Sequence, residues 1–119
     1  MEILDKDYLL QILSPHFIVR DDCVLFEPHF SEATYKAHWQ KFALENPTKV
    51  EATLNHIHLS ELTPRPGDQR ELGIKIQGVW EQHLGALFPR CLFEIKLTEA
   101  PLDSETEVTL DVWTIRDKR

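Results

Sequence analysis

Hydrophobic residues recur every three to four positions in several segments of the chain, which is the spacing expected of helices with one buried face. The longest such stripe covers residues 72–87 and predicts the longest helix of the protein. Shorter stripes predict further helices over residues 5–13, 31–46 and 48–57. Each of these helices would have one face for packing and one for solvent.

Elsewhere the composition and alternation of residues are typical of strands with one buried face. Alternation over residues 91–98 and 108–115 predicts a C-terminal hairpin. Two β-favouring runs at 17–19 and 24–26 predict a second hairpin around an Asp-Asp turn. The order of elements is then α-β-β-α-α-α-β-β, which indicates an α+β fold. We expect residues 1–119 to form a single globular domain with one antiparallel sheet of about four strands, in two hairpins, and helices packed on one of its faces.

The C-terminal hairpin has two registers that keep its hydrophobic residues on one face, because a two-residue slip preserves inside and outside. Pairing Leu97 with Leu110 places Lys96 opposite Asp111, which is a favourable cross-strand pair. The alternative register would set Asp111 opposite another acid, Glu94. We therefore predict the first register, with the residues between the two strands forming a projecting acidic loop.

Residues 50–59 fit both a helix and a strand. Thr48 followed by Glu51 is a capping box, in which a hydroxyl and a carboxylate satisfy the amides at a helix start. A strand would instead explain the alternation of Val50, Ala52, Leu54, His56 and His58. We favour the helix because of the capping box and the good helix formers that follow it.

This choice bears on metal binding. On a strand, His56 and His58 would project from the same face and, together with His83, could bind a metal ion. On a helix, His56 and His58 lie about 200° apart and cannot share an ion. We therefore predict neither a metal site nor a cofactor. A small metal- or acid–base-dependent enzyme that uses these three histidines is the alternative function.

The composition is strongly acidic. The 119 residues include 20 Asp and Glu against 13 Lys and Arg, so the formal net charge is −7. This balance disfavours binding to a nucleic-acid backbone and suits a basic protein partner. The candidate partner-binding residues are five acids with no base between them and a tryptophan that follows: Glu99, Asp103, Glu105, Glu107, Asp111 and Trp113. A tryptophan on the polar face of a strand is the type of anchor that protein interfaces use.

The chain has no glycine-rich phosphate loop, no nucleophile elbow and no paired Cys-x-x-Cys motif. No apolar run is long enough to cross a membrane, and the acidic start does not resemble a secretory signal. We therefore expect a cytoplasmic protein in which Cys23 and Cys91 are free thiols. These features favour a function in binding another protein, of the immunity-protein or antitoxin type. A homo-oligomer formed through Trp113 and Ile115 is a further alternative.

Overall fold

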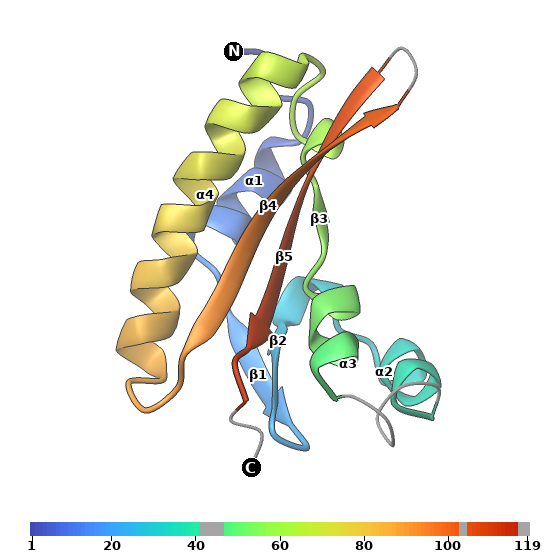
Figure 1. Cartoon of the computed structure of the whole chain (residues 1–119), viewed down its shortest axis with the longest axis vertical. Coiled ribbons are helices and arrows are strands. Elements are labelled where there is room, and N and C mark those ends of the chain that lie inside the picture. The colour runs from blue at the N-terminus through green and yellow to red at the C-terminus, as the bar shows by residue number, and fades with distance from the viewer. Residues whose placement is uncertain (41–46, 103–104, 117–119) are drawn as a thin grey trace.

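The computed structural model describes residues 1–40, 47–102 and 105–116 of the chain (Figure 1). Its helices are α1 (Lys6–Leu13), α2 (Glu32–His38), α3 (Pro47–Leu54) and α4 (Pro66–Leu87). Its strands are β1 (Phe17–Arg20), β2 (Cys23–Phe26), β3 (Ile57–His58), β4 (Phe93–Leu102) and β5 (Glu105–Thr114). The fold is α+β, so the class predicted from the sequence is confirmed.

The strands form two small antiparallel sheets rather than the single sheet expected from the sequence. β1 and β2 make a two-stranded hairpin, and β3, β5 and β4 make a three-stranded sheet in that order. The hairpin turns at Asp21 and Asp22, as predicted, and both have positive φ values, 51° and 65°. Positive φ at both central residues is what a two-residue hairpin turn of type I′ needs, and Asp tolerates it better than most residues.

Trp80 joins α4 to α1 and to the hairpin in the main core. Its side chain is fully buried, and its indole N–H donates to the Ile12 carbonyl at 2.8 Å. Its ring also packs against Phe17 and Phe26, with centroid separations of 5.2 and 4.9 Å. α4 and α1 therefore cover the same face of the three-stranded sheet (Figure 1).

α4 approaches β4 closely at Gly73. A Cβ atom at this position would lie 2.6 Å from Leu97 Cδ1, so any other residue here would require the Leu97 side chain to shift. One turn earlier, Arg70 forms an ion pair with Glu99 of β4. Glycine at this position lets the helix lie this near the strand while Leu97 keeps its conformation.

The register of β4 and β5 is the one predicted from charge pairing. The central pairs are Ile95–Val112, Lys96–Asp111 and Leu97–Leu110. The predicted acidic loop is wrong, because pairing continues as far as Leu102 opposite Glu105. Longer strands give more backbone groups a hydrogen-bond partner than a loop of the same residues would, which favours the extended pairing.

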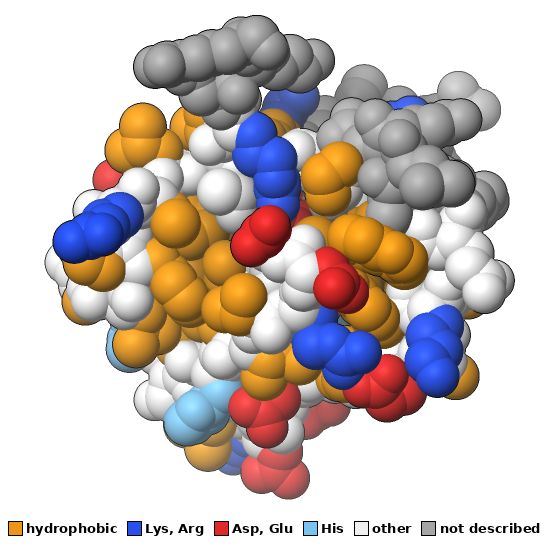
Figure 2. Space-filling model, turned by 90° about the horizontal axis from the view of Figure 1, so that it is seen from below, with side chains coloured by type: hydrophobic (Ala, Val, Ile, Leu, Met, Phe, Trp, Pro, Cys, Tyr) orange, Lys and Arg blue, Asp and Glu red, His pale blue; other side chains and the backbone are white. Residues whose placement is uncertain are grey.

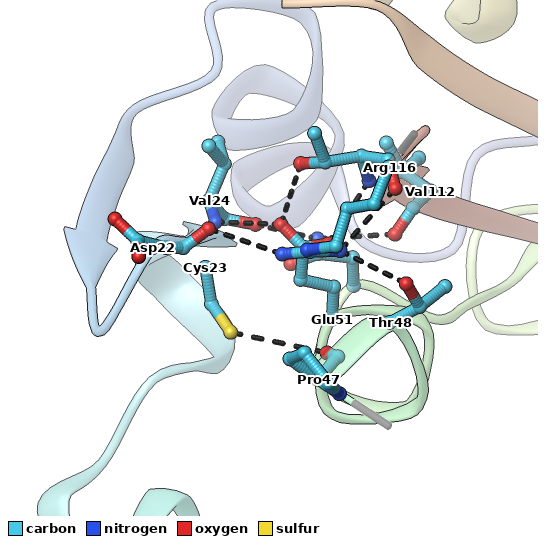
Figure 3. Close-up of polar contacts among 10 residues, drawn as sticks. Asp22, Cys23, Val24, Pro47, Thr48, Glu51, Val112 and Arg116 are labelled. Atoms are coloured by element: carbon cyan, nitrogen blue, oxygen red, sulfur yellow. Dashed lines mark hydrogen bonds and ion pairs between the residues drawn. The ribbon is translucent and has the colours of Figure 1, made fainter. Parts of the chain in front are cut away.

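Glu51, on α3, fills part of the gap between the edges of the two sheets (Figure 3). Its carboxylate is fully buried and accepts the backbone amide of Val24, on β2, at 2.8 Å. It also accepts the backbone amide of Thr114, on β5, at 2.9 Å and the guanidinium of Arg116 at 2.6 Å. One acidic side chain thus bonds to both sheets and to the C-terminal segment.

Asn55 lies one helical turn after Glu51 and bonds to the same two edges. Its carboxamide oxygen accepts the Phe26 amide at 2.8 Å, and its nitrogen donates to the carbonyls of Val24 at 2.9 Å and Val112 at 3.2 Å. A peptide group in a parallel strand bonds in the same way, to the residues on either side of its neighbour. The two hairpins stay in separate sheets because α3 side chains, rather than a strand, occupy the facing edges of β2 and β5.

The capping-box prediction is therefore wrong. α3 begins at Pro47, a residue favoured at the first position of a helix, and Thr48 lies inside the first turn. The Thr48 hydroxyl accepts from Arg116 at 2.9 Å, and Glu51 points into the core instead of back to the helix start. After Leu54 the chain extends into β3, so residues 50–59 contain both a helix and a short strand.

We predict that Glu51→Ala lowers the free energy of unfolding by about 3–5 kcal/mol, because it leaves strand amides and the Arg116 guanidinium without their buried acceptor. Urea denaturation monitored by tryptophan fluorescence measures this. Glu32→Ala is the matched control, since Glu32 forms an exposed ion pair with Arg20. The control should change stability little, because solvent screens exposed pairs. Equal effects in the two variants would show that Glu51 does not join the sheets.

His29 forms a second polar link, between α1 and the end of α3. Its Nδ1–H donates to the Leu54 carbonyl at 2.9 Å, so its Nε2 is left to accept the hydroxyl of Tyr8. Burial lowers the pKa of His29 from its ordinary value of 6.5. The folded protein therefore favours the neutral ring, whose two nitrogens match these two partners.

We predict that His29 makes stability fall on acidification. The contribution of the neutral ring is complete above the ordinary histidine pKa of about 6.5. It is lost as the pH falls below that value, because the unfolded chain then binds a proton that the folded chain resists. In His29→Asn, the fall in unfolding free energy between about pH 7.5 and about pH 5.5 should be smaller than in the wild type. His16→Asn, at an exposed histidine, is the matched control. An identical pH dependence in wild type and His29→Asn would contradict the assignment.

Candidate functional site

On the face of the three-stranded sheet opposite α4, α3 lies next to β5 (Figure 1). Residues on this face are those that alternate with the core positions of β4 and β5. Trp113 and Asp111 of β5 lie here, opposite Glu94 and Lys96 of β4. All four side chains are exposed or half-buried.

An open hollow of about 460 Å³ lies on this face, between α3 and the middle of the hairpin. We call it the outer hollow. Its lining residues come from α3 and the segment after it, from β4 and from β5: Ala52, Thr53, His56, Lys96, Thr98, Asp111 and Trp113. The tryptophan ring provides an apolar wall, and hydroxyl, ammonium, carboxylate and imidazole groups surround it.

His56 and Asp111 form an ion pair through the imidazole Nδ1 and the carboxylate. Both side chains are partly exposed, at 31% and 24%. The ring of His58 lies edge-on to that of His56, with centroids 4.4 Å apart. A carboxylate at Nδ1 fixes the orientation of an imidazole ring.

α3 holds its part of the outer hollow in place through the Glu51 network. Arg116 donates to Thr48, to Glu51 and to the Asp22 carbonyl at 3.1 Å, and it thereby ties the C-terminal segment to α3 and to the hairpin (Figure 3). This placement of the helix puts Ala52, Thr53 and His56 on the wall of the outer hollow. Sequence reasoning missed Glu51 and Asn55 as buried groups. The available signal was two polar residues four positions apart beside the apolar stripe of Val50 and Leu54.

The predicted partner-binding residues do not all lie on one face. Asp111 and Trp113 line the outer hollow, whereas Glu99 lies on the α4 side of the sheet, paired with Arg70. Glu105 and Glu107 belong to β5, and Asp103 lies outside the described residues. Sequence alternation placed Asp111 and Trp113 correctly on the outer face.

The three histidines of the alternative enzyme are separated. His56 and His58 are neighbours on the outer side of the sheet, but His83 is exposed on α4, which covers the inner side. Within the described residues, no group of three or more His, Cys, Asp or Glu side chains is placed to hold a metal ion. The metal arrangement imagined for a strand therefore does not form from these three residues.

The two cysteines differ in environment. Cys23 is buried, its Sγ lies 3.8 Å from the Pro47 carbonyl, and burial raises the pKa of its thiol to about 11. A thiol held protonated in this way is a poor nucleophile. Cys91 is exposed, and neither cysteine forms a disulfide.

Hydrophobic side chains gather among charged ones at the lower end of the molecule (Figure 2). The elements that reach this end include the β1–β2 hairpin, α2, the end of α4 and the end of β5 (Figure 1). Exposed large hydrophobic residues in or next to these elements include Val19, Leu87, Leu92 and Ile115, each about half exposed or more. The Ile115 amide donates to the Leu92 carbonyl at 2.8 Å, so these two residues are neighbours, while Trp113 lines the outer hollow.

Comparisons of the chain with protein-family models, with curated proteins and with solved structures found no match. None of the helices in the described part of the chain is both long enough and apolar enough to cross a lipid bilayer.

Proposed function

We propose that this chain acts in the cytoplasm by binding another protein at the outer hollow, with Trp113 as the anchor of the interface. The observation that carries the proposal is a partly exposed tryptophan beside an open hollow, on a sheet face that no helix in the described part of the chain covers. Tryptophan is among the residues that most often dominate binding energy, especially where a surrounding rim excludes water.

The surroundings of Trp113 fit that role. The ring stands on the central strand of the sheet, which is held on one side by β4 and on the other by β3 and α3. A rigid platform lowers the entropy cost of binding, because little has to be ordered when the partner arrives. Lys96 and the His56–Asp111 pair supply polar contacts at the rim.

The charge of the chain favours a basic partner. A net charge of −7 on 119 residues raises the rate of encounter with a positively charged protein, and Glu94 adds an exposed acid opposite Trp113. In this proposal Glu99, Asp103, Glu105 and Glu107 add to the negative potential that attracts the basic partner. Neutralisation of a basic protein by a small acidic one is the mode of action of the immunity and antitoxin type.

We predict that Trp113→Ala weakens binding of the partner roughly 30-fold or more, the effect of losing an interface hot spot. The measurement compares proteins captured from cells by immobilised wild type, Trp113→Ala and Leu10→Ala, followed by titration of the purified partner. Leu10 is 64% exposed on α1 and serves as the matched control. The partner should be basic, and its association should slow as salt is added. Equal capture by all three chains, or an acidic partner, would contradict the proposal.

The His56–Asp111 pair supports a second candidate, acid–base catalysis in the outer hollow. A carboxylate-oriented imidazole is a common general base, and Thr53, Thr98 and Lys96 lie in the same hollow. This version of the enzyme hypothesis does not need His83 or a metal.

Hydrolysis of a panel of activated carboxylic and phosphate esters distinguishes the two functions. If His56 is a general base, His56→Ala should lower the rate by about 10²–10⁴-fold, and Asp111→Asn should lower it as well. His58→Ala is the matched control, because it changes the neighbouring ring. Rates that are equal in the three variants and the wild type would exclude this chemistry and leave partner binding.

A further inference from the structure

β4 is an outer strand of its sheet, and no strand of the described residues lies beside its second edge. The Ile115 amide donates to the Leu92 carbonyl at 2.8 Å, which shows that residue 92 directs its backbone groups toward the β5 side. In an antiparallel pair this direction alternates, so Phe93, Ile95 and Leu97 direct theirs toward the free edge. The Ile95 carbonyl confirms it, because Gln77 of α4 donates to it at 2.6 Å.

A groove of about 320 Å³ runs between this edge and α4. It is lined by Ile74, Gln77, Gly78, Glu81, Phe93 and Ile95. Ile74 is 54% exposed, and a Cβ atom on Gly78 would meet nothing within 4 Å. An open strand edge beside a groove is where a further strand can add to a sheet.

The charges along β4 are complementary to those of a second copy of β4. In an antiparallel pair with Ile95 opposite Ile95, Glu94 of each copy lies opposite Lys96 of the other, and Phe93 lies opposite Leu97. Because 93, 95 and 97 all direct their backbone groups outward, this alignment also matches donors with acceptors. Moving the centre to residue 96 would set Lys96 against Lys96, and moving it to 94 would set Glu94 against Glu94.

The helical layer has the same symmetry. Gln77 bonds to Ile95, so the two-fold axis through Ile95 passes near Gly78 of α4. Antiparallel α4 helices centred on Gly78 place Lys75 of each copy level with Glu81 of the other. Gly78 itself, without a side chain, allows the helices to approach closely.

We infer that two copies of this chain pair through the free edge of β4, with Ile95 opposite Ile95 about a two-fold axis, to form one continuous sheet of three strands from each copy. Gln77 then caps the Ile95 carbonyl in the separate protomer, and the Ile95 amide of the second copy replaces it. A two-fold axis normal to the sheet puts both outer hollows on the same side of the joined sheet. The inference does not depend on the proposed function, because the interface leaves Trp113 and Ile115 outside the strand contact.

Analytical ultracentrifugation over a dilution series tests the interface. The wild type should dimerise, and Lys96→Glu should raise the dimer dissociation constant roughly tenfold or more, because it sets two acids opposite each other twice. The exchange variant Glu94→Lys, Lys96→Glu should restore the wild-type value. Both variants place an acid opposite Asp111 within the protomer, so the exchange variant controls for any effect on folding.

Cross-linking gives an independent measurement on the helical layer. In a Cys91→Ser background, Gly78→Cys should link to its copy through a short bismaleimide, whereas Gly85→Cys should not. A Cβ atom meets nothing within 4 Å at either position, but Gly85 in the two copies would lie about 21 Å apart along antiparallel helices. A wild type that is monomeric throughout, a dimer that tolerates Lys96→Glu, or failure of the exchange variant to restore it would each overturn the inference.

Discussion

Glu51 of α3 and Asn55, which directly follows α3, complete the hydrogen bonding of two strand edges that face each other. Without them, the amides of Val24, Phe26 and Thr114 would be buried donors without acceptors. Each such group costs free energy comparable to a lost hydrogen bond, so the placement of α3 is coupled to that of both sheets. Arg116 adds the charge that the buried carboxylate needs, and it comes from the residues just after β5.

The same constraint shapes the outer hollow. Because Glu51 and Asn55 point inward, Ala52, Thr53 and His56 are left on the side of α3 that meets the outer face of β5. His56 then reaches Asp111, and Trp113 closes the opposite wall. The candidate site is therefore a consequence of how the helix is fixed to the sheets, and its residues come from distant segments of the chain.

The outward backbone groups on the two edges of the β4–β5 hairpin have different hydrogen-bond partners. Next to β5, a short strand and two helix side chains satisfy the outward backbone groups in turn: Leu110 pairs with Ile57, Val112 bonds to Asn55 and Thr114 bonds to Glu51. On the outer edge of β4, the Gln77 side chain of α4 donates to the backbone carbonyl of Ile95. A single flexible amide is easier to displace than a buried carboxylate with its arginine, which is why β4 is the edge open to a second copy.

The sequence alone determined the elements whose signals are local. The long stripe of α4, the Asp-Asp turn of the first hairpin and the alternation in β4 and β5 follow from spacing, backbone preference and periodicity, and the pairing of Lys96 with Asp111 selected the correct register. Alternation also placed Trp113 and Asp111 on the outer face. These features depend on residues within one element or one hairpin.

Tertiary structure decided whatever depended on distant partners. Glu51 fits a capping box in the sequence, but its carboxylate is buried, where it bonds to Arg116 and to the amides of two strands. The helix begins at Pro47 instead of after Thr48. The meeting of His56 with Asp111 and the division into two sheets followed from the burial of Glu51. A buried polar group must find its partners wherever the chain supplies them, and neither spacing nor propensity records which distant backbone groups those will be.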